Sequence, residues 1–350
     1  MKWKYNSKSK KSNYSSIAGK KQFFELTFDV KHKEMVMDAY LPYVIETFKA
    51  MKDAEKIVKL HTLPRSDTYT MMRWSAINLE HPAAFETIAM DTKQKRLLLE
   101  DLDRFVKRKE FNQRVGRAWK RGYLLYGPPG TGKSSLIAAI ANYLKFDIYD
   151  LQLTHLTSDV ELRRVLLATT NKSILVNEDI DCSQLKLQDK SNSSKKNDSE
   201  SYQLSLSGLL NFTDGLWSGC GEERIIVFTT NHKSKLDPAL LRSGRMDMHF
   251  HMSYCSHEGF KTLASTYLGI KEHQPLFDEI KSLLQKTDVT PAQVAEELMK
   301  SEDANVALQA LITRLKEIKK KKEDDKKAKD EAKVKNDTKK VDPKQLTYFI

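Results

Sequence analysis

The sequence predicts an α/β protein, in which a parallel sheet is covered by helices on both faces. A small all-helical domain follows the sheet, and part of an α+β domain precedes it. Between residues 83 and 254, short apolar runs alternate with segments of helical periodicity. A glycine-rich turn joins one of these runs to an alanine-rich helix, and after residue 255 only helical patterns occur. Strands that alternate with helices form parallel sheets buried on both faces.

The chain has 350 residues, of which 40% are hydrophobic, and this is enough for two or three globular units. The predicted organisation is a disordered basic segment at 1–16, a partial N-terminal domain at 17–82, the sheet domain at 83–254 with a mobile insertion at 183–203, a helical lid at 255–318 and a charged tail at 319–350. The tail mixes lysine with acidic residues, so it is expected to be either a lone charged helix or disordered.

The N-terminal part has a mixed pattern. Residues 23–28 predict a strand with no assigned partner. Apolar residues recur at helical spacing from 32 to 56, which predicts a helix with a kink at Pro42. Residues 57–63 and 74–79 are rich in β-forming side chains and predict two further strands of the same small domain.

The remaining elements follow from periodicity and capping signals. Asp91 with Gln94, and Ser158 with Glu161, have the spacing of helix N-caps. Helices are predicted at 91–108, 136–144, 158–170, 205–217 and near 238–242, with strands at 146–151, 173–177, 224–230 and 248–254. In the C-terminal part, a threonine followed by proline and then glutamine predicts a helix start at residue 290.

The glycine-rich turn has the spacing of a phosphate-binding P-loop, G-x-x-x-x-G-K-[ST], between a predicted strand and a predicted helix. Glycines let the backbone N–H groups point inward as an anion nest at the helix N-terminus. Lys133 is expected to reach the β- and γ-phosphates, and the Ser134 hydroxyl to bind Mg²⁺. The predicted nucleotide-binding residues are Gly127, Pro128, Pro129, Gly130, Thr131, Gly132, Lys133, Ser134 and Ser135.

Three further signals follow in order along the chain. An apolar strand ends in Glu178 and Asp179, of which one is expected to hold hydrated Mg²⁺ and the other to polarise the attacking water. Asn231 ends the next strong strand, where it either orients this water and senses the γ-phosphate or is an ordinary capping residue. Arg242 and Arg245 are either surface charges or arginine fingers that act on a neighbouring subunit's nucleotide.

Taken in this order, the motifs GPPGTGKS, the acidic pair, FTTN and LDPALLRSGR resemble those of the AAA ATPases over residues 80–318. The stretches AWKRGYLLYGPPGTGKSS, EDIDCS, GLLNF, DGLW, ERIIVFTTN and GRMDMHFHMSYC are similar to its plant branch, which is related to the mitochondrial chaperone that inserts the Rieske protein into complex III. LPYV and HPAAFETIAMD resemble the end of that branch's N-terminal domain. The resemblance implies a P-loop NTPase fold, ATP and Mg²⁺ as cofactors, and a homo-oligomeric ring that hydrolyses ATP to remodel or translocate a protein client.

The resemblance also assigns individual roles. This branch carries Glu before Asp in its Walker B motif, so Glu178 is assigned to the metal together with Ser134, and Asp179 to the water. The catalytic set implied by the family is Lys133, Glu178, Asp179, Asn231 as sensor 1, and Arg242 and Arg245 as the finger pair.

Two positions depart from the family pattern. Asn177 stands in a strand where the family has an apolar residue. A buried amide without a partner costs about 1–3 kcal/mol, so Asn177 is expected to weaken the fold, to re-aim the acids or to find a partner beside the metal site. Ser243 replaces the usual proline between the fingers, which is expected to loosen that turn slightly. The aromatic-hydrophobic-glycine pore loop is missing, and Thr-His-Leu-Thr stands in its place at 154–157. The protein is therefore not expected to thread an unfolded client past aromatic side chains.

The net charge of +12 is concentrated at the two ends of the chain. Such charge is compatible with nucleic acid or an acidic membrane. Neither end interleaves aromatic with basic residues, so nucleic-acid binding is not expected and solvated tails are preferred. Two alternatives to the ATPase are a nucleotide-gated scaffold with weak hydrolysis and a nucleic-acid-stimulated ATPase.

No apolar run approaches the ~20 residues that span a bilayer, and the start of the chain does not resemble a signal peptide. Cys182, Cys220 and Cys255 are widely spaced, which indicates a reducing compartment. An intracellular, cytoplasmic location is therefore expected for the chain as given. Members of the resembled branch usually begin with a membrane helix, so the chain is expected to be a truncated product, a partial gene model or a soluble paralogue. Anchored relatives are expected at a mitochondrial or endoplasmic reticulum membrane, and a full-length form of this chain could associate with a membrane.

Overall fold

The computed structural model describes residues 1–9, 20–63, 74–153, 156, 158–180, 206–214, 223–270, 272 and 274–339. The chain divides into two compact units, Met1–Lys56 and Ile57–Ile350. The predicted mobile insertion at 183–203 lies outside the described residues, as do Cys182, Cys220 and all of 154–157 except Leu156.

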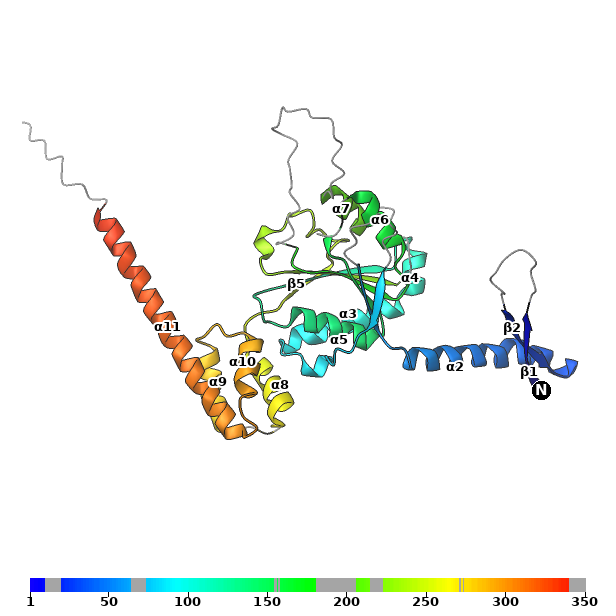
Figure 1. Cartoon of the computed structure of the whole chain (residues 1–350), viewed down its shortest axis with the longest axis horizontal. Coiled ribbons are helices and arrows are strands. Elements are labelled where there is room, and N and C mark those ends of the chain that lie inside the picture. Colours follow the sequence, from blue (N-terminus) through cyan, green and yellow to red (C-terminus); the bar gives the residue numbers. More distant parts are fainter. Residues whose placement is uncertain are drawn as a thin grey trace, which may run out of the picture. The chain divides into compact units, whose positions relative to one another are not determined.

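The first unit is a hairpin followed by a helix (Figure 1). Its elements are β1 (Lys2–Ser9), β2 (Lys20–Thr27), η1 (Val30–His32), α1 (Lys33–Met35), η2 (Val36–Tyr40) and α2 (Leu41–Ala54). The helix predicted at 32–56 is confirmed, and its irregular part is the π-helical turn η2 just before Pro42, whose ring has no N–H to donate.

The prediction of disorder at 1–16 is wrong for β1. This strand pairs antiparallel with β2, so the strand expected near 23–28 has a partner. Trp3 and Tyr5 alternate with lysines and share a face, and both rings contact Phe24, with centroids 6.3 and 5.2 Å away. Cross-strand aromatic pairs stabilise a hairpin. The segment was predicted to be disordered because most of its residues are polar, although its aromatic residues alternate as in a strand.

The second unit is built on a seven-stranded sheet in the order β4-β3-β6-β7-β8-β5-β9. The strands are β3 (Lys59–Thr62), β4 (Ser75–Asn78), β5 (Lys120–Tyr126), β6 (Asp147–Asp150), β7 (Ser173–Asn177), β8 (Arg224–Thr230) and β9 (Met248–His251). Every neighbouring pair is parallel except β3 with β4, which is antiparallel.

The predicted domain boundary at residue 82 is wrong for the two strands before it. β3 pairs in parallel with β6, where Leu60 lies opposite Ile148, and β4 extends the sheet beyond β3. Both strands therefore belong to the main sheet and not to a separate N-terminal domain. Their β-forming sequences predicted strands correctly, but the partner of a strand is set by pairing with a distant segment and leaves no local signal.

Helices cover both faces of this sheet (Figure 1). They are η3 (Phe85–Thr87), α3 (Thr92–Lys107), α4 (Lys109–Arg114), α5 (Lys133–Leu144), α6 (Asp159–Leu167), α7 (Leu206–Asp214) and η6 (Lys233–Lys235). Successive strand residues point to opposite faces, so Tyr123 packs in the core formed by α3 and α5, whereas Leu124 packs in the core formed by α6. Turns at 238–241 and a bend at Arg242 stand in place of the predicted helix.

The C-terminal part is helical, as predicted. It contains α8 (His257–Leu268), α9 (Leu276–Leu284), α10 (Pro291–Leu298) and α11 (Ala304–Lys339), which share a core of their own. The predicted start of α10 is confirmed by a capping box between Thr290 and Gln293. α11 continues through the predicted lid boundary at 318, so the tail is helical as far as Lys339. Among the described residues, none of the helices has both the length and the apolar composition needed to cross a bilayer.

Candidate functional site

The P-loop lies between β5 and α5, as its sequence predicts. Gly127 has φ +147°, and a Cβ there would lie 1.9 Å from the carbonyl oxygen of Met252. Gly132 has φ +89° and forms the N-cap of α5. Only glycine fits the first position without moving the backbone, and the second is a left-handed conformation that side chains disfavour. The loop therefore turns sharply into the positive end of a helix, where anions bind.

Lys133 points back into this loop. Its side chain is buried, and Nζ donates hydrogen bonds to the carbonyl oxygens of Gly127 (2.9 Å) and Pro128 (3.1 Å). Nζ also donates to Oδ1 of Asn231 at 2.7 Å. The ammonium group is thus held among oxygens at the mouth of the loop, and Asn231 reaches it from the end of β8.

The two acids lie next to this group at the end of β7. Oγ of Ser134 donates to Oε1 of Glu178 at 2.6 Å. Nδ2 of Asn231 is 3.3 Å from Oδ1 of Asp179, and the Asp179 N–H donates to Oγ1 of Thr229 at 2.9 Å. Asp179 has φ +48°, a conformation that is uncommon outside glycine and that clusters at functional sites. The hydroxyl and carboxylate oxygens of Ser134 and Glu178 are the hard donors that Mg²⁺ prefers, so this pair fits the metal.

A pocket of about 490 Å³ opens over the P-loop and these acids. Its opposite wall comes from the segment around η3 and from the helical lid, and its members are Thr87, Ile88, Ala89, Leu263, Tyr267, Pro291, Ala292 and Ala295. The Ala292 N–H donates to the Gly130 carbonyl at 3.1 Å, so the lid contacts the P-loop directly. The size and the mixture of apolar with polar lining suit a small organic ligand. The sequence reasoning missed this wall, because it is made of three separate segments with no common motif.

Asn177 lies at the end of β7 and is 4% exposed. Among the described residues, its Nδ2 has no hydrogen-bond partner. One expectation for Asn177 was a hydrogen-bond partner beside the metal site. Its Nδ2 has no such partner among the described residues. A buried unpaired donor costs about 1–3 kcal/mol.

Replacing Asn177 by valine should therefore raise the free energy of unfolding by about 1–3 kcal/mol, measured by urea denaturation. Valine removes the unpaired donor and favours the strand. Asn142→Leu is the matched control: Asn142 Nδ2 donates to the carbonyls of His81 and Ala83, both at 2.9 Å, so its loss should lower stability. A lower stability for Asn177→Val would contradict the assignment of an energetic cost to this amide.

The two predicted finger residues differ in their surroundings. Within the described part of the chain, the exposed side chain of Arg242 makes no hydrogen bond or ion pair. Arg245 is mostly buried: Nη1 donates to the Ala239 carbonyl at 2.6 Å, and Nε lies 3.8 Å from Oδ2 of Asp214. Neither arginine lines the pocket over the P-loop. The structure therefore brings Lys133 and the acids together but leaves the arginines outside that group.

The base of β5 carries a charged network that the sequence reasoning missed. Asp101 of α3 accepts hydrogen bonds from Arg121 (2.8 and 2.7 Å) and from the Tyr123 hydroxyl (2.7 Å). Burial raises the pKa of Tyr123, and the charge of Asp101 raises it further. Burial acts to lower the pKa of Arg121, but its hydrogen bonds to Asp101 and the charge of that carboxylate outweigh this, so the pKa is raised. The network ties the P-loop strand to the helix that covers it.

Comparison with protein families gives two adjoining matches. Residues 123–254 match the "ATPase family associated with various cellular activities (AAA)". Residues 255–329 match the "At3g28540-like, AAA+ ATPase lid domain". The first match contains the P-loop, both acids, Asn231 and the two arginines, and the second contains the lid residues that wall the pocket.

Similar proteins occur in Arabidopsis thaliana. The chain is 58% identical to AAA-ATPase At5g17760 over 309 residues, which is 87% of this chain and 60% of that protein. It is 52% identical to AAA-ATPase At5g17730, covering 90% of this chain and 68% of that protein. It is 52% identical to Protein HYPER-SENSITIVITY-RELATED 4, covering 86% and 54% respectively. The chain thus spans a little over half to about two thirds of the length of these relatives.

Proposed function

Because the chain belongs to the AAA ATPase family, in its At3g28540-like plant branch, we propose that it binds ATP in the P-loop pocket and hydrolyses it to ADP and phosphate. The observation that carries the proposal is a hydrogen-bonded chain of three side chains beside a separate hydrogen-bonded pair. Lys133 contacts Asn231, Asn231 contacts Asp179, and Ser134 contacts Glu178, all at the mouth of the P-loop. Separate segments converge on the place where a γ-phosphate would lie.

The residues of this cluster have distinct roles in the proposal. The backbone of the P-loop and the Lys133 ammonium bind the phosphates, and the lid wall with Ile88 and Tyr267 holds the nucleoside. Ser134 and Glu178 would hold Mg²⁺, which supplies positive charge to the phosphate oxygens when bound. Asp179 accepts the proton of the attacking water, and Asn231 orients that water through its position between Asp179 and Lys133.

We further propose that the active form is a homo-oligomeric ring. The exposed guanidinium of Arg242 does not line its own chain's pocket, which suits a group that stabilises charge on the nucleotide of a neighbour. The proposed client is a protein, and a relation of this plant branch to the mitochondrial complex III assembly chaperone is part of the same proposal. ATP turnover would remodel or translocate this client.

Steady-state phosphate release by the purified chain tests the hydrolysis. Lys133→Ala should lower the rate at least about hundredfold, because it removes a preorganised charge from the phosphate site. Asp179→Asn should lower the rate by about 10²–10⁴ while ATP still binds, because it removes only the general base. Lys93→Ala, an exposed lysine on α3 outside the pocket, is the control and should keep the wild-type rate. Equal rates in all four proteins would refute the proposal.

A nucleotide-gated scaffold with little hydrolysis is the second candidate, and the unpaired amide of Asn177 favours it. Asn177 is directly before the two acids, so a displaced strand end would misplace both. Tight ATP binding without turnover in the wild type, with turnover recovered in Asn177→Val, would support the scaffold. Turnover in the wild type at an ordinary rate of about 1 s⁻¹ or more would exclude it.

A further inference from the structure

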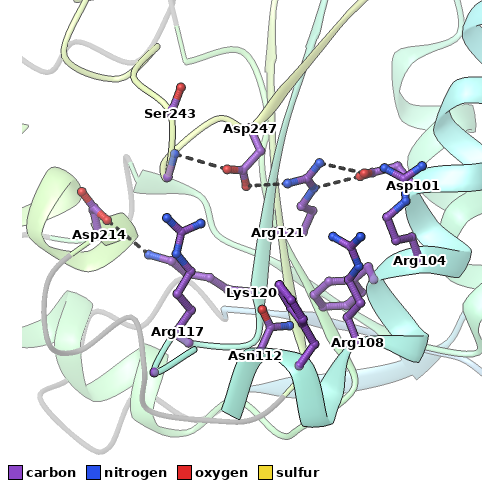
Figure 2. Close-up of a pocket in the computed structure, with 15 residues that line it drawn as sticks. Asp101, Arg104, Arg108, Asn112, Arg117, Lys120, Arg121, Asp214, Ser243 and Asp247 are labelled. Carbon is purple, nitrogen blue, oxygen red and sulfur yellow. Dashed lines mark hydrogen bonds and ion pairs between the residues drawn. The ribbon is translucent and has the colours of Figure 1, made fainter. Parts of the chain in front are cut away.

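A second pocket, of about 620 Å³, lies beside the turn that carries Arg242 (Figure 2). Its walls come from the end of α3, from α4, from the start of β5 and from Ser243 and Gly244. None of the residues that line the P-loop pocket lines this one. The proposed ATPase mechanism leaves it without a role.

The carboxylates in this pocket already have partners. Asp101 is bound by Arg121 at 2.7 Å, and Asp247 lies 3.8 Å from the same guanidinium. Asp247 also accepts hydrogen bonds from the backbone N–H groups of Gly122 (2.9 Å) and Gly244 (3.2 Å). Asp214 lies 3.6 Å from Lys120 and 3.8 Å from Arg245. All three acids are therefore paired with positive side chains, and these ion pairs link the walls of the pocket.

Three arginines of the lining have no such partner. The side chains of Arg104, Arg108 and Arg117 are exposed and make no ion pair within the described residues, although Arg108 stacks over the Phe111 ring at 5.2 Å. Figure 2 shows Arg104 and Arg108 on one side of the pocket and Arg117 on the other, where its side chain overlaps that of Lys120 in this view. Three like charges around one hollow repel one another and gain from an anion between them. Guanidinium groups bind phosphate through paired hydrogen bonds.

We propose that this pocket is a binding site for a compact anion with two or more phosphate groups, held by Arg104, Arg108 and Arg117. Its volume exceeds that of the P-loop pocket, so a chain of several phosphates fits, either free or as the tail of a nucleotide. Ser243 and Gly244 form one wall, and they directly follow Arg242 in sequence. Occupancy of the pocket therefore alters the turn that presents Arg242. This effect on hydrolysis rests on the proposed function, whereas the binding itself does not.

The test is calorimetric titration of the full chain with inorganic tripolyphosphate, after Mg²⁺ and saturating ADP have filled the P-loop. Wild-type protein should bind one tripolyphosphate per chain. Arg108→Gln with Arg117→Gln should raise the dissociation constant at least about tenfold, since each charge-assisted hydrogen bond is worth about that factor. The charge-matched control is Lys93→Gln with Arg96→Gln, two exposed residues of α3 outside the lining, and it should stay within about twofold. A second arm titrates ADP alone: two ADP per wild-type chain and one per double variant would identify a nucleotide tail as the source.

Four results would overturn the proposal: no tripolyphosphate binding by ADP-saturated wild type together with only one ADP per wild-type chain in the second arm, equal binding by wild type and pocket variant, equal weakening in both double variants, or tighter binding of a glutamate-rich peptide of the same charge. The last result would identify an acidic protein segment as the occupant. ATP hydrolysis by the two double variants is measured in parallel. Loss of tripolyphosphate binding without any change in hydrolysis would retain the site and reject its link to Arg242. Failure of all hydrolysis in the wild type would reject the proposed function and leave the binding result intact.

Discussion

Replacement of Arg242 by alanine is expected to lower ATP hydrolysis by about 10³–10⁵, the range found for arginine fingers, with nucleotide affinity nearly unchanged. The physical reason is the position of the Arg242 side chain. The side chain is exposed, has no partner among the described residues and lies outside its own chain's nucleotide pocket. In the proposed ring, it would act on the charge that develops at a neighbour's γ-phosphate without affecting how its own chain holds ATP. Phosphate release and equilibrium binding of a fluorescent ATP analogue measure the two effects.

Arg245→Ala is the matched control, and it should behave differently. Arg245 donates to the Ala239 carbonyl and lies near Asp214, so its removal should lower the thermal midpoint of unfolding. A mixture of Lys133→Ala and Arg242→Ala subunits should recover turnover. One subunit then holds ATP with its intact Lys133, and the other supplies Arg242. Loss of ATP binding in Arg242→Ala, or a mixture without activity, would contradict the shared site.

Asp101→Ala is expected to lower the free energy of unfolding by about 3 kcal/mol or more, which is typical of breaking a buried ion pair. The Asp101 side chain is 6% exposed and the Arg121 side chain 29% exposed. Among the described residues, the substitution leaves the Arg121 guanidinium with the more distant Asp247 alone, and it removes the acceptor of the buried Tyr123 hydroxyl. Urea denaturation followed by circular dichroism measures the change.

Asp103→Ala separates this effect from the general loss of a carboxylate on α3. Asp103 lies two positions further along the helix and accepts one hydrogen bond, from the exposed Tyr143 hydroxyl. Its loss should cost less than about 1 kcal/mol, as for other exposed polar contacts. Equal destabilisation by the two substitutions would mean that the Asp101 network adds nothing beyond surface helix charge.

Local patterns were enough for most of the elements and for the order of the motifs. The P-loop spacing, the acids after an apolar strand and the capping boxes depend on residues close in sequence, so they predicted β5, α5, β7 and the start of α10. The hairpin strand β1 was missed, because lysine-rich composition was weighed above the alternation of Trp3 and Tyr5.

Local patterns did not predict which distant segments pair with one another. The placement of β3 and β4 in the main sheet depends on hydrogen bonds between β3 and β6, which is far along the chain. The sequence of a strand does not indicate which strand it pairs with. The lid wall of the nucleotide pocket and the Asp101 network join segments that share no motif.

The sequence by itself determined which chemistry this chain carries: a phosphate-binding loop, two acids, a polar strand end and two arginines, all in the order of one family. Only the tertiary structure decided how the two arginines differ: Arg245 binds its own chain, whereas Arg242 has no partner among the residues that the structure describes. It also decided that three further arginines surround a second hollow. The reason is that the effect of a charged side chain depends on the groups around it. Those groups come from distant parts of the chain, and only tertiary packing brings them together.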